Sequence, residues 1–373
     1  MTHSDLIVIG GGVIGLSIAW EASQHGLSVT LLEDRAEVGR GCSWAAAGIL
    51  PATNLKTATD PLERLRGLSH QLHPQWARKL RELTGIDTGL RRCGGLYVAT
   101  TPGEAAALVG LQDYWKSDAI ECRRLFPAEL ASVEPALQPM IQSQRLRLAL
   151  QVPDEHQLRC PSHLKALEFV CRQAGVRVET SATARSFAES SRQVTVVTEH
   201  DTFHGGAMVL TAGSWSTLIG QQCGVSLQVV PVRGQMLLYR LPSPLFRHVI
   251  NEGNRYFVAR EDGHLLIGSC EEEVGFQEQT TTAALERFRH WAIGYYPALG
   301  ALQPIKSWAG LRPGTVDGFP YIGRIPGRQN CFVATGHYRS GIHLSCGTAV
   351  VILDLITGQK PRIACDEFRV GRG

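Results

Sequence analysis

A glycine-rich turn, Gly10-Gly11-Gly12-Val13-Ile14-Gly15, restricts the possible folds of this chain more than any other segment. It follows an apolar run, Leu6–Ile9, that is typical of a buried parallel strand. A helical pattern over Val13–Gln24 and a second apolar run over Ser28–Leu32 come next. The segment therefore predicts a strand–helix–strand unit whose turn has the GxGxxG spacing of dinucleotide-binding folds.

Each residue of this turn has a physical role in such a site. Gly10 allows the tight turn, Gly12 lets the backbone approach a pyrophosphate, and Gly15 lets the helix pack closely on the strand. Val13 and Ile14 open the helix, whose N–H groups and positive dipole end attract phosphate. The motif predicts a bound dinucleotide and is equally compatible with FAD and NAD.

An acidic residue lies where the ribose of a dinucleotide would be held. Glu33 ends the second strand 18 residues after Gly15, and we assign it, together with Asp34, to the cofactor site. A carboxylate at this position accepts hydrogen bonds from the ribose hydroxyls and repels a 2′-phosphate. NADP is therefore disfavoured.

Two further segments favour a flavin. Residues 39–49 are mostly small, so their backbone N–H groups can approach a bulky flat ring. Residues 334–342 join the last apolar strand to the last helix, and the helix N–H groups there suit the flavin pyrimidine, where negative charge collects on reduction. A tightly packed loop and a plain strand–helix turn are the structural alternatives for the two segments.

The remaining pattern mixes helices with antiparallel strands, which predicts two interleaved domains. Further helices are expected at residues 61–83 (with an interruption at Pro74), 103–116, 161–175, 280–296 and 342–356. Further strands are expected at residues 95–100, 176–179, 208–211, 229–239, 256–260, 265–269 and 331–334.

Composition excludes several other classes of protein. The chain has 373 residues, a net charge of +3 and 44% hydrophobic residues, an ordinary globular composition for about two to three domains. Lys and Arg are scattered, so nucleic acid is not an expected partner. The best apolar run near the C-terminus, Thr348–Ile356, contains Asp354, and no membrane span is expected.

The N-terminus and the cysteines bear on location. A strand pattern begins almost at once and leaves no room for a signal peptide, which predicts a cytoplasmic protein. The ten cysteines include no CxxC pair, and we expect reduced thiols that are mostly buried. No metal site is expected.

With these segments in place, the sequence resembles the flavin-dependent amino-acid oxidases of the D-amino-acid oxidase superfamily, and most closely the glycine oxidases of thiamine synthesis. The resemblance covers nearly the whole chain. Besides the segments above, it rests on Asp154-Glu155 with Pro161 and residues 164–167, and on residues 211–216, 232–236, 308–313, 317–323 and 336–341.

The resemblance implies an α/β fold with an FAD-binding, Rossmann-like domain of the D-amino-acid oxidase type. An interleaved α+β domain with an antiparallel sheet would bind the substrate. The implied FAD-binding domain comprises residues 1–88, 150–222 and 305–373, and the implied substrate domain comprises residues 89–149 and 223–304. A homo-oligomer is compatible with the family.

The same resemblance implies the residues that contact the cofactor. Glu33 would hold the adenosine ribose, and Ala184 would lie near the adenine. The residues that would line or border the flavin or its pyrophosphate are Ser43, Ala46, Ala47, Gly48, Gly213, Trp215, Arg339, Ser340, Gly341 and Ile342. Sarcosine oxidases attach their flavin through a Cys in the region matching residues 308–312, which has none here, so non-covalent FAD is expected.

Three residues are implied to handle the substrate. Arg312 would grip the substrate carboxylate, because a guanidinium offers a planar fork that pairs bidentately with it. Tyr256 would reach the same carboxylate, and Arg339 would lie close to the substrate. The implied reaction is hydride transfer from the α-carbon of glycine or another small amine to the flavin, followed by imine hydrolysis and reduction of O₂ to peroxide.

One departure from the family pattern concerns specificity. Glu271 stands where glycine oxidases carry an apolar residue, and it would either face solvent or contact a substrate amine. Three alternatives remain from the sequence: an amino-acid dehydrogenase that passes electrons to a quinone or protein, oxidation of 2-hydroxy acids, and a non-catalytic flavoprotein.

Overall fold

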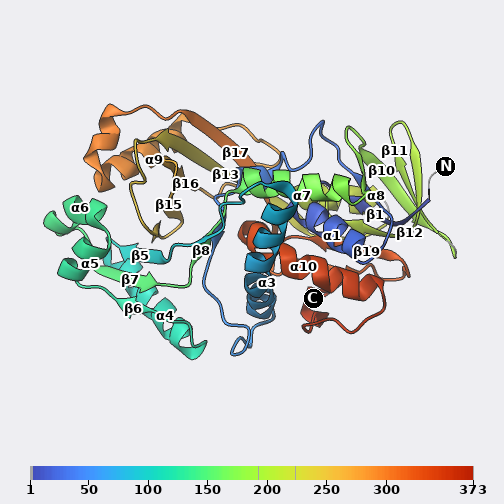
Figure 1. Ribbon diagram of the computed structural model, residues 1–373, viewed down its shortest axis with the longest axis horizontal. Coiled ribbons are helices and arrows are strands. Elements are labelled where there is room, and N and C mark those ends of the chain that lie inside the picture. Colours follow the sequence, from blue (N-terminus) through green and yellow to red (C-terminus); the bar gives the residue numbers. More distant parts are fainter. Residues whose placement is uncertain (1–2, 192, 223, 373) are drawn as a thin grey trace.

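The computed structural model describes residues 3–191, 193–222 and 224–372 and contains two large sheets (Figure 1). The first sheet has the order β10-β11-β12-β1-β2-β9, with β19 beside β12 and β18 beside β19. Its strands are β1 (His3–Ile9), β2 (Val29–Leu32), β9 (Arg177–Glu179), β10 (Ala184–Glu189), β11 (Val194–Thr198), β12 (Thr202–Leu210), β18 (Tyr321–Arg324) and β19 (Cys331–Thr335). Strand β1 pairs in parallel with both β2 and β12, as a nucleotide-binding sheet requires.

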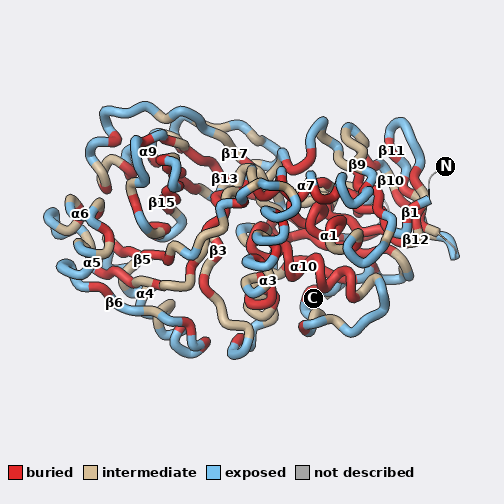
Figure 2. Tube along the Cα trace, in the orientation of Figure 1, coloured by how far each residue is buried: buried red, intermediate tan, exposed pale blue. Residues whose placement is uncertain are grey.

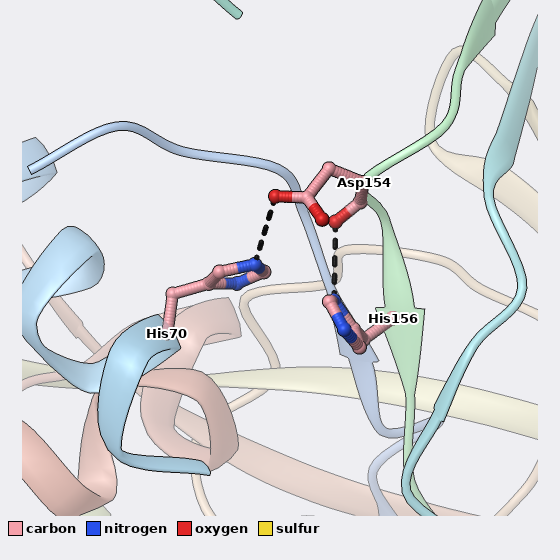
Figure 3. A group of neighbouring side chains, drawn as sticks. All are labelled: His70, Asp154 and His156. Carbon is pink, nitrogen blue, oxygen red and sulfur yellow. Dashed lines mark hydrogen bonds and ion pairs between the residues drawn. The ribbon is translucent and has the colours of Figure 1, made fainter. Parts of the chain in front are cut away.

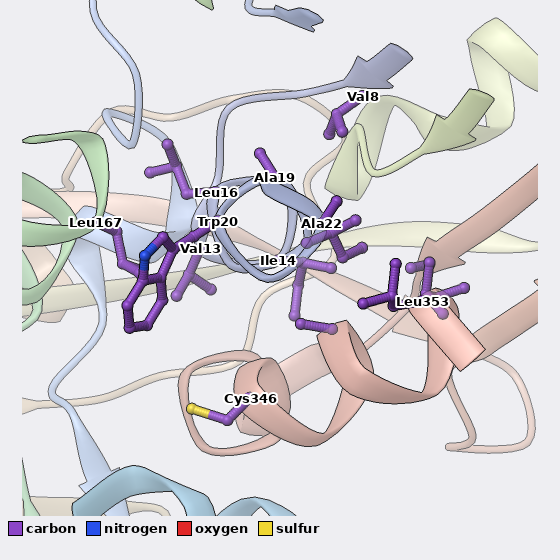
Figure 4. Packing of buried hydrophobic residues seen from close by; sticks show 14 of the residues in the cluster. Val8, Val13, Ile14, Leu16, Ala19, Trp20, Ala22, Leu167, Cys346 and Leu353 are labelled. Carbon is purple, nitrogen blue, oxygen red and sulfur yellow. The ribbon is translucent and has the colours of Figure 1, made fainter. Parts of the chain in front are cut away.

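Four helices form the core of this half: α1 (Val13–Gln24), α3 (Pro61–Thr84), α7 (Cys160–Gln173) and α10 (Gly341–Ile356). Helix α1 packs against both α7 and α10, and Figure 4 shows Trp20 of α1 beside Leu167. The segment Tyr338–Ile356 has a mean hydropathy of 1.3 and the length to cross a membrane, but 72% of it is buried inside the fold. It is therefore used here as a core helix.

Helix α3 matches its predicted limits but not the predicted break. Asp60 caps its N-terminus by accepting hydrogen bonds from the N–H groups of Leu62 and Glu63, and Gly85 ends it in the left-handed conformation. The interruption expected at Pro74 does not occur. Pro74 lies on the exposed face, where the helix continues past it.

The second sheet is mostly antiparallel and has the order β17-β13-β16-β15-β14-β5-β7-β6. Its strands are β5 (Gly95–Ala99), β6 (Arg123–Arg124), β7 (Leu148–Val152), β13 (Val229–Arg240), β14 (Val249–Glu252), β15 (Arg255–Ala259), β16 (His264–Gly268) and β17 (Lys306–Thr315). Helix α9 (Thr282–Tyr295) covers it through Trp291 and Tyr295, which pack on Phe257. The helices α4 (Pro102–Ser117), α5 (Pro127–Val133) and α6 (Gln138–Gln142) form its outer, largely exposed end (Figure 2).

Short elements connect the two halves. A small sheet joins β3 (Ile49–Leu50), β8 (His156–Gln157) and β4 (Arg91–Arg92). The remaining helices are α2 (Cys42–Ala45) and α8 (Ser216–Gln222), with 3₁₀ turns at Pro135–Leu137, Gly213–Trp215, Pro297–Ala301, Tyr338–Ser340 and Asp366–Phe368. Strand β17 falls in the segment 305–373 yet pairs along its length with β13, so it ties the two implied domains together. The domain boundaries themselves stay a prediction.

The burial of the cysteines can be compared with the expectation of reduced, mostly buried thiols. Of the nine described cysteines, four are buried (Cys160, Cys171, Cys331 and Cys346) and five are half-buried, so fewer are buried than expected. Cys223 lies outside the described residues. Burial raises the pKa of Cys160 to about 12, so its thiol is protonated at neutral pH.

Candidate active site

A cavity of about 620 Å³ opens at the carboxyl ends of the first sheet and extends to the second sheet. That volume is within the range of small-molecule and cofactor sites. The cavity is lined by the turn after β1, by residues 41–49 and 334–343, and by parts of β13, β15 and β17. Every site residue expected from the sequence lines it except Gly15.

Gly15 does not line the cavity, but it allows α1 to pack closely on β1 next to the glycine turn. A Cβ atom on Gly15 would overlap the carbonyl oxygen of Gly10, which is why α1 packs so closely on β1. Gly10 has a φ of +111°, and a Cβ there would lie 2.6 Å from the Thr211 carbonyl oxygen. Ser43 Oγ accepts a hydrogen bond from the Val13 N–H at 3.0 Å, so the 39–49 segment caps α1. The other N–H groups of the first helical turn have no intrahelical acceptors.

Glu33 is held in place by the backbone around it. Its Oε2 accepts a hydrogen bond from the Gly11 N–H at 2.7 Å, and its Oε1 accepts one from the Arg35 N–H at 2.9 Å. Burial raises the pKa of Glu33. Each carboxylate oxygen accepts more than one hydrogen bond, so both can still bind ribose hydroxyls. Asp34 accepts a hydrogen bond from Thr183, whose neighbour Ala184 also lines the cavity.

The small residues of the 39–49 segment are fixed by a buried arginine that the sequence analysis missed. Arg260 donates to the Ala47 carbonyl oxygen and to Gln157, each at 2.7 Å. Gly48 has a φ of +72°, and a Cβ there would overlap the Leu158 carbonyl oxygen. Burial lowers the pKa of Arg260 to about 10, and it stays charged at neutral pH.

The residues expected at the flavin come from two cavity-lining segments, around Gly213 and around Ser340, and a hydrogen bond joins these segments. Gly213 accepts a hydrogen bond from Thr335 Oγ1 at 3.1 Å, and Trp215 lies 5.5 Å from the Arg35 guanidinium. Ser340, Gly341 and Ile342 form the opening turn of α10 at the cavity. His337 also lines the cavity; it is buried, and its Nε2 lies 3.1 Å from Thr348 Oγ1.

Arg312 brings an uncompensated positive charge to the cavity wall. Its Nη1 donates to the Cys270 carbonyl oxygen at 2.9 Å and its Nη2 donates to Ser269 Oγ at 2.6 Å. Both partners are neutral, and within the described ranges no carboxylate forms an ion pair with it. A Cβ on Gly234 would overlap the guanidinium, so that glycine makes room for it. Arg312 therefore suits a carboxylate ligand.

Tyr256 lies beside Met236 in the same wall, with Oη 3.3 Å from the sulfur. Both residues pair with Gly268 of the intervening strand, which brings their side chains together. Met236, Asn251 and Tyr97 also line the cavity, and the sequence analysis missed them. The alternation of cavity-facing residues along β13, Gly234 and then Met236, is the signal that would have indicated this wall.

Behind this wall lies a buried acid. Glu155 is 0% exposed and accepts hydrogen bonds from Tyr97 and, at 3.1 Å, from Asn251 Nδ2. Burial raises its pKa to about 7. Because this pKa is above that of a glutamate in the unfolded chain, ionisation favours unfolding as pH rises from about 4.5 to 7.

We expect Glu155→Gln to remove this pH dependence. Relative to the wild type, the free energy of unfolding of the variant should rise by about 3 kcal/mol between pH 5 and pH 8. Urea unfolding at the two pH values measures it, and Glu121→Gln, an exposed position, is the control. The same difference between variant and wild type at both pH values would refute the assignment.

Three side chains of metal-binding type gather outside the cavity (Figure 3). His70 Nε2 lies 3.2 Å from Asp154 Oδ2, and His156 Nδ1 lies 3.1 Å from the Asp154 carbonyl oxygen. Asp154 Oδ1 also pairs with Arg92 Nε at 2.9 Å. Each residue thus has a partner, and the cluster is explained as a network that joins α3 to the turn before β8. The expectation of no metal site stays a prediction.

The glycine turn, Glu33 with its backbone donors, and a cavity that reaches a second sheet are typical of dinucleotide-dependent oxidoreductases. The profile of the FAD dependent oxidoreductase (DAO) family matches residues 5–355, and the chain belongs to this family. Its cofactor is therefore FAD, which the glycine cradle, Glu33 and the size of the cavity fit. The α/β fold with a second, antiparallel domain is confirmed.

Individual relatives are similar over the full length. Glycine oxidase of Geobacillus kaustophilus is 33% identical over 374 residues, 100% of this chain and 98% of that protein. The crystal structure of glycine oxidase from Geobacillus kaustophilus superposes with a TM-score of 0.94 at 32% identity, covering 100% of both chains. The bifunctional protein ThiO/ThiG of Synechocystis sp. is 33% identical over 96% of this chain, which spans 52% of that protein.

Proposed function

We propose that this chain is an FAD-dependent amino-acid oxidase that deaminates glycine or another small amino acid. The observation that carries the proposal is Arg312, a cavity-lining guanidinium whose partners are neutral. The full-length similarity to glycine oxidases supports the substrate class. A role in thiamine synthesis is supported by the similarity to the ThiO/ThiG protein.

The side chains around Arg312 orient the substrate. When bound, FAD supplies the oxidising chemistry, because its flavin accepts a hydride from the substrate α-carbon. Arg312 fixes the carboxylate through two parallel N–H donors, while Ser269 and the Cys270 carbonyl hold the guanidinium in place. Tyr256, 8% exposed, adds a hydroxyl to the cavity wall next to Met236 and helps exclude water.

Attachment of the cofactor is proposed to be non-covalent. Among the described residues, Cys42 is the cysteine that lines the cavity. Burial raises the pKa of Cys42 to about 11, so it is a protonated thiol and a poor nucleophile. Acid precipitation should release all the flavin into the supernatant.

The measurement that tests the proposal is the stoichiometry of turnover in air with glycine. An oxidase consumes one O₂ and releases one ammonia and one peroxide for each glycine oxidised. Ammonia formed only with an added quinone or dye would instead favour the dehydrogenase alternative. No turnover with any amino acid or 2-hydroxy acid, despite bound FAD, would favour a non-catalytic flavoprotein.

Two further expectations belong to this proposal. A cytoplasmic location is tested by fractionating cells that express the tagged chain. A homo-oligomer is tested by light scattering of the purified protein.

A further inference from the structure

Two of the arginines that line the cavity were expected at the substrate, and a glutamate compensates one of them. Arg339 lines the cavity with Arg312, but their surroundings differ. Arg339 Nη1 pairs with Glu271 Oε1 at 2.8 Å, whereas Arg312 contacts neutral groups. Glu271 is the residue that departed from the expected family pattern, and the structure pairs it with Arg339.

Asn254 holds the ion pair in one geometry. Its Oδ1 accepts a hydrogen bond from Arg339 Nη1 at 3.1 Å, and its Nδ2 lies 3.5 Å from Glu271 Oε2. The side chains of Arg339 and Glu271 are 38% and 30% exposed, so the pair lies at the rim of the cavity. Burial and the neighbouring Glu271 carboxylate raise the pKa of Tyr338, which also lines the cavity. Glu271 thus meets the cavity through its ion pair with Arg339, a residue of the cavity lining.

Among the described residues that line the cavity, Arg35, Arg185 and Arg339 form ion pairs, whereas Arg312 has neutral partners. A ligand with a single carboxylate satisfies Arg312 and leaves the Arg339–Glu271 pair intact. A second carboxylate on the ligand would gain little from Arg339, because Glu271 already compensates the charge of that guanidinium. The same carboxylate would be repelled by Glu271.

We propose that Glu271 is a specificity-determining residue that selects substrates with one carboxylate over those with two. The inference rests on the proposed function for its choice of substrate. The occupant it disfavours is an amino acid with a second carboxylate, for example iminodiacetate, which is glycine with a carboxymethyl group on nitrogen.

The first test compares kcat/KM for iminodiacetate and glycine in the wild type and in Glu271→Gln. The substitution keeps the size of the side chain and frees Arg339. We expect the iminodiacetate-to-glycine ratio to rise at least about fivefold, mainly through a lower KM for iminodiacetate. Added salt should reduce the difference between the two proteins. An unchanged ratio would overturn the proposal.

Two variants separate this role from a general loss of negative charge. Glu273→Gln removes the same charge two residues away, at an exposed position with no ion pair among those that the described residues form. Glu273→Gln should have the same iminodiacetate-to-glycine ratio of kcat/KM as the wild type. Adding Arg339→Met to Glu271→Gln should abolish the gain, because the second carboxylate then has no cation to bind. A gain that persists in the double variant would contradict the proposal.

A binding measurement keeps the inference independent of turnover. Acetate and malonate carry one and two carboxylates, and their binding is followed by the change in the visible absorption of the bound FAD. Glu271→Gln should lower the Kd of malonate relative to that of acetate by the same factor. Failure to oxidise glycine and every other small amino acid would refute the proposed function, whereas an unchanged malonate-to-acetate ratio would refute the role of Glu271.

Discussion

Replacing Arg312 with Met should lower kcat/KM for glycine about 10²- to 10³-fold, while the protein keeps its FAD. Removing one partner of a hydrogen-bonded charge pair costs about 2–5 kcal/mol, and here the lost partner binds the substrate carboxylate. Met has a similar length and lacks the charge. Steady-state kinetics with glycine and the visible spectrum of the purified variant measure the two quantities.

Arg312→Lys is the informative companion variant. An ammonium keeps the charge but lacks the planar fork, so it should recover only part of the lost kcat/KM. Binding of acetate to the Met variant should weaken in parallel with the loss of activity. A Met variant whose kcat/KM stays within fivefold of the wild type would show that another group binds the carboxylate.

The second large effect is expected at Gly15. In Gly15→Ala the new methyl group would overlap the Gly10 carbonyl oxygen, so α1 must move away from β1. We expect a destabilisation of about 3 kcal/mol or more and purification of a colourless, FAD-free protein. Denaturant unfolding and the ratio of visible to ultraviolet absorbance measure this.

Gly110→Ala is the matched control. Gly110 lies inside α4, and a Cβ there would have nothing within 4 Å. Because alanine is the better helix former, this variant should be stabilised by about 0.5–1 kcal/mol and should keep its FAD. A Gly15→Ala protein that binds FAD like Gly110→Ala would contradict the close packing of α1 on β1.

The parts of the fold that depend on local sequence could be predicted. The glycine turn, β1, α1 and Glu33 lie within one continuous segment. At each of them a local steric or electrostatic requirement determines which residue type can occur. Strands β10, β11 and β17 were not predicted. The first two are short strands that pair with each other, whereas β17 pairs with β13, which is distant in sequence. The extent of β17 follows from its pairing with β13, which no local pattern encodes.

In the candidate site, too, the residues that depend on contacts between distant segments could not be predicted from local sequence. Arg312, Tyr256 and Arg339 were implied by the family resemblance, since no spacing in the chain connects them. Arg260 was missed because its contacts to Ala47 and Gln157 come from distant segments. The sequence left two orientations for Glu271, and its pairing with Arg339 depends on the approach of two loops 68 residues apart.

The most direct test of the account is the visible spectrum of the purified protein mixed with excess glycine in the absence of air. We expect a yellow protein whose flavin absorption bleaches on mixing and returns when air is admitted. A colourless protein without FAD would contradict it, as would bound FAD whose absorption stays unchanged with glycine and with every other small amino acid.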